Sequence, residues 1–410
     1  MSATKPTGGA ATAHSGSMQA GEVDAVLAAV AVALVAFGVV MVFSASAVLS
    51  DRAYGDGTHY LVRQALYAVA GLVVMGTLSR IDYPRWHRLT LPLLAAVTLL
   101  LLAVLLGWGR TAGGATRWIA LGPIHVQPAE AAKLVVVLWL ARSLAAKRER
   151  IRTFSIGFLP HALVAGVLAA LCLAQPDFGS ALMIVLLTFI LLFTAGARTG
   201  YLLGALLAAL PLLWALVAGS PYRLRRIEAF LDPFAHRLDA GYQISESLLA
   251  FGAGGLTGVG LGDSRQKLFF LPEAHTDFIA AIVAEELGLL GVLGLLGAYA
   301  LLFARGLRAA LRAPDAYGLY LGIGATTFVG VQALTNLAVV TGLLPTKGLA
   351  LPFVSYGGSS LLVNCAAVGL LLNLSRVRAA DDGASRTAEA ARATPMVRQH
   401  GRPLPRGATT

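Results

Sequence analysis

The chain has 410 residues, of which 57% are hydrophobic and 13% are charged, with 32 Lys and Arg against 21 Asp and Glu. A soluble globular protein carries about a quarter of its residues as charges, so this composition excludes that class. It also excludes a disordered chain and a disulfide-rich secreted scaffold. A net charge of +11 suggests a nucleic-acid partner in a soluble chain, but polar surface is too scarce here, and membrane topology explains the charge better.

Ten apolar stretches have lengths close to the roughly 20 residues that cross a bilayer as a helix. They predict an all-α integral membrane protein with about ten transmembrane helices. The second stretch is short, and the fourth carries Glu130 and Lys133 near its start. The stretches cover residues 25–48, 64–79, 89–109, 129–146, 157–175, 178–197, 199–219, 278–304, 318–344 and 349–375.

The loops between these stretches differ in positive charge. The even-numbered loops hold twelve Lys and Arg residues, against five in the short odd-numbered loops. Because cytoplasmic loops carry the excess of Lys and Arg, we expect the even loops and both termini in the cytoplasm. The large loop 220–277, between the seventh and eighth spans, is then extracytoplasmic. We expect a membrane domain over residues 24–375 and disordered cytoplasmic tails over residues 1–23 and 376–410.

Carboxylates in or beside the membrane are informative, because burying one costs at least ~2.5 kcal/mol on insertion scales. Asp277 ends the large loop at the mouth of the eighth span. It could cap that helix, as Asp often does. It could instead be a general base whose pKa is raised by partial desolvation, with Thr276 as the cap. Glu285 falls near the same helix face and Glu286 does not. Both could be structural residues satisfied by neighbouring helices, which is the favoured interpretation for Glu286.

Positive groups on the outer side are few. Arg223, Arg225 and Arg226 mix with apolar residues as in a helix lying on the membrane interface. Such a helix could anchor to anionic lipid or recognise a phosphate-bearing head group. Lys347 and Arg117 lie in other outer loops, where they could snorkel or meet the charge of a departing diphosphate.

Polar residues also interrupt the last two spans. Gln332 and Asn336, one turn apart, are typical of hydrogen bonds between membrane helices. Residues 351–360 contain a proline, two glycines and three serines, including Ser355 and Ser359. They predict a broken helix start, which either packs closely against a neighbour or lines a substrate cavity.

Several motifs in a fixed order resemble the SEDS family (shape, elongation, division and sporulation). The resemblance covers residues 23–376 and extends to the division members rather than the elongation members. The matching segments are residues 44–46, 117–119, 127–130 with Lys133, 175–179, 241–243, 272–278, 345–348 and 355–360. One departure is Ala129, where the family usually has Ser.

The resemblance implies a peptidoglycan glycosyltransferase that polymerises lipid II by inverting β-1,4 transfer during septal wall synthesis, with undecaprenyl diphosphate as leaving group. Asp277 would be the essential carboxylate, and Glu273, His275, Ser355 and Ser359 would face the substrate. Lys347, Arg117, Arg223 and Arg226 would meet the diphosphate. A divalent cation, Mg²⁺ or Mn²⁺, could assist if shared with the substrate, because the sequence shows no metal cage.

The same resemblance implies a multi-pass protein of the bacterial cytoplasmic (inner) membrane at the division septum, with a periplasmic active site. Its partners would be lipid II, lipid-linked glycan, membrane lipids, a class B penicillin-binding transpeptidase and other divisome proteins, and no nucleic acid. Two alternatives stay open. A lipid II flippase would use polar residues along a path, namely Glu130, Lys133, Glu285, Gln332 and Asn336. A divisome scaffold would depend on its outer helices and tails instead.

Overall fold

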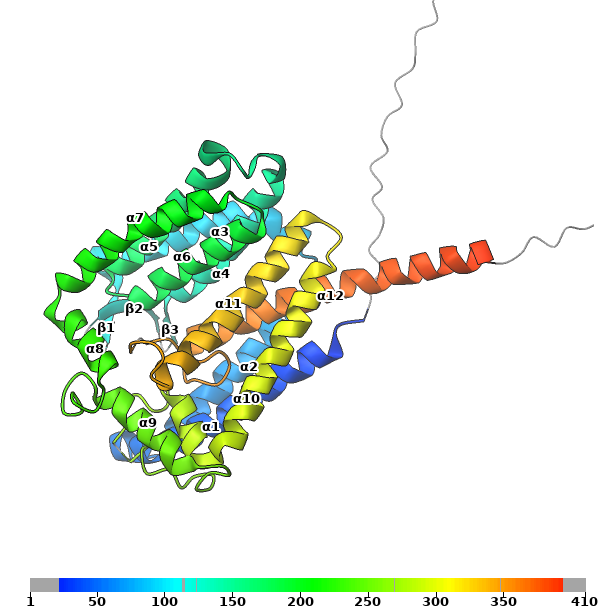
Figure 1. The fold of residues 1–410 in the computed structure, drawn as a ribbon. Coiled ribbons are helices and arrows are strands. Elements are labelled where there is room, and N and C mark those ends of the chain that lie inside the picture. The colour runs from blue at the N-terminus through cyan, green and yellow to red at the C-terminus, as the bar shows by residue number, and fades with distance from the viewer. Residues whose placement is uncertain (1–21, 113–114, 123, 269, 347, 394–410) are drawn as a thin grey trace, which may run out of the picture.

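The computed structural model describes residues 22–112, 115–122, 124–268, 270–346 and 348–393. Figure 1 shows a bundle of long helices with a small sheet at one end. The α-helices are α1 Ala25–Tyr54, α2 His59–Arg80, α3 Pro84–Ala103, α4 Pro128–Ala146, α5 Leu159–Ala174, α6 Phe178–Thr194, α7 Thr199–Ala218, α8 Pro221–Leu231, α9 Tyr242–Gly254, α10 Ile279–Leu311, α11 Ala316–Val340 and α12 Gly358–Ala393. Short helical turns are Val104–Trp108, Arg148–Arg150 and Phe154–Phe158.

Every predicted apolar stretch lies on one of these helices, which confirms a helical membrane protein. Seven helices in the described part of the chain are long and apolar enough to cross a membrane, and Phe178–Thr194 and Thr199–Pro211 are shorter apolar helices. The charged α4 is not among them, although most of its residues are buried. The count of ten spans and the placement of both termini in the cytoplasm stay predictions.

One loop adds a small sheet to the predicted helical fold. Between α3 and α4 the chain forms a three-stranded antiparallel sheet of β1 Arg110–Ala112, β2 Ala115–Leu121 and β3 Ile124–Val126. The register pairs Arg110 with Trp118 and Ile119 with Val126. These strands are only three to seven residues long, so their period-two pattern is too short to recognise beside the apolar stretches.

Helix starts follow local rules. Asp24, Asp177 and Asp315 precede α1, α6 and α11, and each side chain accepts a backbone N–H of the first turn. Pro128 opens α4, where a missing N–H costs nothing. Asp177 lies in the segment 175–179, one of those that resemble the SEDS family, and its carboxylate is occupied as a helix cap.

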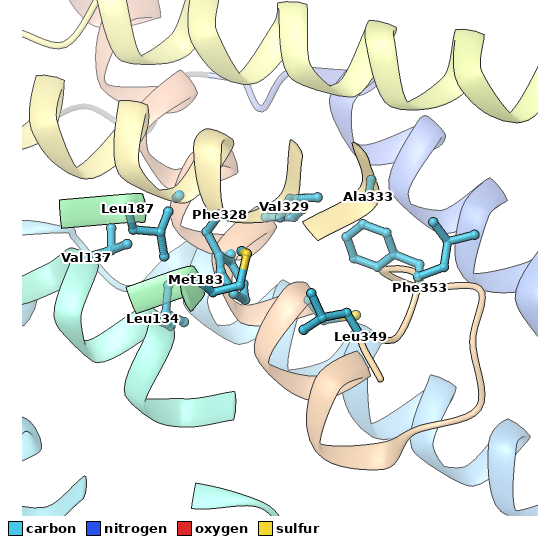
Figure 2. Close-up of a cluster of buried hydrophobic side chains, with 14 of the residues drawn as sticks. Leu134, Val137, Met183, Leu187, Phe328, Val329, Ala333, Leu349 and Phe353 are labelled. Atoms are coloured by element: carbon cyan, nitrogen blue, oxygen red, sulfur yellow. The ribbon is translucent and has the colours of Figure 1, made fainter. Parts of the chain in front are cut away.

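The centre of the bundle is formed by α4, α11 and α12. In the most apolar window of α11 and of α12, 72% of residues are buried, against 22% for α2 and α3. Figure 2 shows where Val137 of α4, Leu187 of α6 and Phe328 of α11 meet. Leu349 and Phe353, from the segment before α12, extend the same cluster. Their burial anchors that segment against α11.

The tenth apolar stretch begins as irregular chain, as its glycines and proline predict. Residues 349–357 contain no regular helix and are largely buried, and α12 starts only at Gly358. Irregular backbone at membrane depth is stable where protein surrounds it. At its other end α12 continues to Ala393, beyond position 375, where the sequence places the end of the membrane domain, and Figure 1 shows it projecting from the bundle.

Helix α10 is broken near its first third. Gly288 has φ 64° and ψ −163°, so the helix cannot continue through it. The carbonyls of Glu285 and Glu286 accept the backbone N–H groups of Val259 (3.0 Å) and Gly260 (3.1 Å). The outer loop thus supplies hydrogen-bond donors for the carbonyls at the break, and the short part of α10 between Asp277 and Gly288 is held against that loop.

Candidate functional site

Asp277 lies in the last turn before α10, where the sequence places it. Helix α10 begins at Ile279, and its cap residue Phe278 has no side-chain capping bond. The interpretation of Asp277 as the helix cap is therefore wrong. Thr276 does not cap either, because its hydroxyl donates to the Glu273 carboxylate at 2.8 Å. The Asp277 carboxylate is thus left without a structural hydrogen bond in the described part of the chain.

The backbone around Asp277 is fixed by α11 and by the segment before α12. Asn336 donates from Nδ2 to the Asp277 carbonyl at 2.8 Å and to the Leu349 carbonyl at 2.7 Å. The Ser355 hydroxyl donates to the Thr276 carbonyl at 2.6 Å. Two distant parts of the chain, α11 and the segment before α12, therefore determine where the carboxylate stands. Asn336 is a structural hydrogen-bond donor, as the sequence predicts, but it joins α11 to two irregular segments and not to another helix. The Ser355 hydroxyl binds the backbone of the Asp277 turn.

Gly348 lies directly against the Asp277 carboxylate. A Cβ at this position would be 2.9 Å from Oδ2 of Asp277, closer than real Cβ contacts allow. Any larger residue would push the carboxylate aside. Lys347, predicted to bind the diphosphate, lies outside the described residues, although its neighbours Thr346 and Gly348 both contact the site.

The environment of Asp277 changes its acidity. Burial raises its pKa to about 7, and the nearby Glu273 carboxylate adds to the rise. Arg117 and Arg226 oppose it and lower the pKa. The side chain still has some exposure to solvent. At neutral pH a substantial fraction of Asp277 is therefore ionised yet basic enough to accept a proton.

The two arginines come from separate elements. Arg226, in α8, donates from Nη1 to the Thr346 carbonyl at 3.1 Å. Arg117, in β2, donates from Nε to the Gln175 carbonyl at 3.2 Å and from Nη2 to the Pro176 carbonyl. These carbonyl acceptors help to hold both guanidinium groups near Asp277.

A cleft of about 370 Å³ opens beside Arg226 between α8 and α9. Within it Arg225 and Asp239 form an exposed ion pair at 3.8 Å. Arg223 lies on α8 as well, but its side chain falls outside the described part. The residues lining the cleft include Arg225, Arg226, Asp239, Tyr242, Gln243 and Pro272. The cleft therefore combines positive charge with hydrogen-bonding groups. Pro272, in its wall, precedes Asp277 by five residues.

Glu273 and His275 occupy opposite environments within the same turn. Glu273 is exposed and has φ 56°, a left-handed backbone that a non-glycine residue seldom adopts. His275 is buried, and burial lowers its pKa, while Glu273 raises it. His275 is thus neutral at pH 7, and its backbone carbonyl accepts the N–H of Tyr356 at 2.9 Å.

The remaining predicted polar residues lie inside the bundle. Glu130 and Lys133 form a buried ion pair at 2.7 Å within α4. Gln332 donates to the Ala350 carbonyl at 3.1 Å, a link between helix and loop. Ser359 accepts the N–H of Gln127 at 3.0 Å. Each of these side chains thus has a partner inside the bundle, and none of them contacts the Asp277 carboxylate.

Glu285 and Glu286 hold the outer loop to the bundle. Glu286 accepts hydrogen bonds from Lys267 at 2.8 Å and from Ser44 of α1 at 2.7 Å. Glu285 accepts from the Ser264 hydroxyl and from the backbone N–H of Arg265. The structural role favoured for Glu286 is confirmed, because Ser44 of the neighbouring helix α1 binds it, although its charged partner comes from the outer loop. That partner, Lys267, was missed from the sequence. The available signal was that Lys267 is the one lysine of the large loop 220–277, whose other positive residues are all arginines.

Among the described residues, no three His, Cys, Asp or Glu side chains converge into a metal site. Glu273 and Asp277 are the nearest pair of carboxylates at the site. A divalent cation there would need the rest of its ligands from a substrate.

The fold and the site together define a polytopic membrane protein in which a buried carboxylate, Asp277, lies within the electrostatic influence of two arginines. Residues 24–380 match the family described as "Cell cycle protein", which groups FtsW, RodA and SpoVE. The chain therefore belongs to this family, and the resemblance to SEDS proteins is confirmed.

Individual relatives support the division branch of the family. A protein of Geobacter metallireducens named "Probable peptidoglycan glycosyltransferase FtsW" is 48% identical over 353 residues, covering 86% of this chain and 94% of that protein. One of the same name from Coxiella burnetii is 44% identical over 355 residues, covering 86% and 95%.

Solved structures show the same fold. A chain of a peptidoglycan synthase complex, studied for its coordination of polymerization and crosslinking, aligns with a TM-score of 0.73 at 34% identity. The alignment covers 87% of this chain and 98% of that one. The rod shape determining protein RodA of Thermus thermophilus gives a TM-score of 0.65 at 32% identity, with 87% and 97% covered.

Proposed function

We propose that this chain is a peptidoglycan glycosyltransferase that polymerises lipid II during cell division. Relatives named FtsW support the reaction and the division role. The observation that carries the proposal is Asp277, a carboxylate without a structural hydrogen bond in the described part of the chain, whose pKa is about 7 and feels the charge of two arginines. This is the environment that a general base at neutral pH requires.

In the proposed step, Asp277 takes the proton from the 4-hydroxyl of the GlcNAc on an incoming lipid II. That oxygen attacks the anomeric carbon of the MurNAc at the end of a lipid-linked glycan. The new C1–O4 bond forms as the bond from C1 to the diphosphate oxygen breaks, with inversion at C1. Undecaprenyl diphosphate leaves with the electron pair, and Asp277 holds the proton.

Negative charge that develops on the diphosphate needs positive partners. Arg117 and Arg226 are close enough to Asp277 to lower its pKa, so they can also reach a diphosphate at this site. We assign Lys347 and Arg223 the same task on the basis of their positions beside Gly348 and on α8. A substrate-bound Mg²⁺ or Mn²⁺ would supply further charge neutralisation.

The membrane setting follows from the charge pattern. Lys and Arg are concentrated in the even-numbered loops, which favours an extracytoplasmic, periplasmic position for Asp277 in the inner membrane of the septum. The similarity to a chain of a peptidoglycan synthase complex supports a penicillin-binding protein partner. We propose a class B transpeptidase in that role, together with other divisome proteins.

The test is lipid II polymerisation by the purified protein with its transpeptidase partner. Asp277→Asn is expected to abolish glycan synthesis without loss of folding. Asp263→Asn, which changes an exposed carboxylate of the same outer loop, is expected to leave it intact. Normal polymerisation by Asp277→Asn would overturn the assignment. Lipid II translocation in liposomes, persisting in that variant, would favour a flippase instead.

A further inference from the structure

Five aromatic rings form a continuous row that ends at the Asp277 turn. Tyr54 ends α1, His59 and Tyr60 open α2, His275 precedes Asp277, and Tyr356 precedes α12. We call these five residues the aromatic row. Three chain segments that are distant in sequence supply it, so tertiary structure brings the rings together.

The rings touch one another in sequence along the row. Tyr54 stacks on His59 with centroids 3.9 Å apart and planes at 15°, and His59 meets the edge of Tyr60 at 5.6 Å. Tyr60 then contacts His275 at 4.9 Å and Tyr356 at 5.1 Å. These separations are those of favourable aromatic pairs, so the row is a packed surface with a defined direction.

The row leads from solvent to the reacting group. Tyr54 is 54% exposed at the outer end, His59, Tyr60 and Tyr356 are partly exposed, and His275 is 9% exposed at the inner end. The inner end is two residues from Asp277 in the chain. The Nε2 atom of His59 is buried and has no hydrogen-bond partner among the described residues, so this ring is held in the row by packing.

Aromatic residues at a membrane surface often belong to the interfacial belt, where each ring sits separately among lipid head groups. Trp108 fits that description, because it ends the third span, is 79% exposed and has no ring contact in the described part of the chain. Tyr54 ends the first span, so an even number of crossings places both residues at the same membrane face. The aromatic row differs in being stacked inward towards the site.

Sugar rings are the ligands that such a surface suits. Aromatic faces carry partial negative charge, and the C–H bonds on one face of a pyranose carry partial positive charge, so the two stack. His275 is neutral at pH 7, and Tyr54 and Tyr60 are uncharged, so these rings contribute little to phosphate binding. Positive charge for phosphate binding lies instead in the arginine-lined cleft between α8 and α9, which contains none of the rings of the aromatic row.

We propose that the aromatic row is a carbohydrate-binding subsite that holds the sugar rings of the glycan strand as it leaves the Asp277 site. This inference rests on the proposed glycosyltransferase function and extends it to product binding. Successive saccharides would pack against Tyr60 and then Tyr54, with His59 supporting Tyr54 from behind, so the strand would remain bound between rounds of transfer.

The experiment titrates the full-length protein in detergent with a peptide-free GlcNAc–MurNAc tetrasaccharide and follows binding by saturation-transfer NMR. Tyr54→Ala is expected to weaken binding by roughly 3- to 10-fold, the loss for one stacked ring. Tyr54→Trp is expected to retain binding, and Trp108→Ala to leave it unchanged. Because Tyr54 is exposed, its removal should not alter the melting temperature, which is measured alongside.

A second measurement uses lipid II and the length of the glycan product. Tyr54→Ala is expected to give shorter strands than wild type and Trp108→Ala, because the product dissociates sooner. Tetrasaccharide binding that is absent, or that ignores Tyr54 while strand length is unchanged, overturns the inference. If the wild type binds the tetrasaccharide through Tyr54 but forms no glycan, the proposed function fails and the subsite stands. Equal losses in Tyr54→Ala and Trp108→Ala would assign both residues to the lipid belt.

Discussion

Gly348→Ala tests the position of the Asp277 carboxylate, because it adds one methyl group beside it and changes no charge or hydrogen-bonding group of the site. The added Cβ would lie 2.9 Å from Oδ2 of Asp277, about 0.5 Å inside an ordinary van der Waals contact. The carboxylate must move or rotate, because its backbone is held by Asn336 through the Asp277 carbonyl. A displacement of 1 Å can cost about 100-fold in rate, so a shift half that size should cost roughly 10-fold in kcat.

Gly357→Ala is the matched control in the same irregular segment. Its added Cβ would meet its nearest neighbour, Cβ of Ser360, at 3.8 Å, which is ordinary contact. Both substitutions reduce the freedom of the unfolded chain equally. We expect Gly348→Ala to slow lipid II polymerisation while its melting temperature stays within a few degrees of that of Gly357→Ala. A wild-type rate in folded Gly348→Ala protein would refute the assignment of this carboxylate to the reacting position.

Two further predictions concern charge. The rate of polymerisation should rise with pH through about 7 as Asp277 loses its proton. Glu273 raises the pKa of Asp277 and Arg226 lowers it, so Glu273→Gln should move that rise to lower pH and Arg226→Gln to higher pH. Variant pH–rate profiles that coincide with the wild-type profile would contradict both expectations. Glu286→Gln should destabilise the protein by about 3–5 kcal/mol, because it leaves Lys267 buried without its charged partner, and a thermal melt should show recovery when both residues become Met.

The sequence by itself determined the class of protein and singled out Asp277, the carboxylate that we propose reacts. Uninterrupted apolar stretches can only be satisfied as membrane helices, so composition and spacing sufficed to predict the helical membrane domain. Asp277 could be singled out because a carboxylate beside an apolar span is costly and therefore rare. The break before α12 followed from its proline and glycines.

Only the tertiary structure decided what surrounds Asp277. Sequence patterns report local periodicity, whereas the surroundings of this carboxylate come from distant positions. Gly348 lies against it, and Arg117 and Arg226 act on its pKa by their charge, from between about 50 and 160 positions away along the chain. Local propensity favoured a helix cap at Asp277. In the structure α10 begins at Ile279, so the cap position falls on Phe278 and the Asp277 side chain does not cap the helix. The pairing of Lys267 with Glu286 likewise arises because the loop folds back onto a helix broken at Gly288, a contact no local pattern encodes.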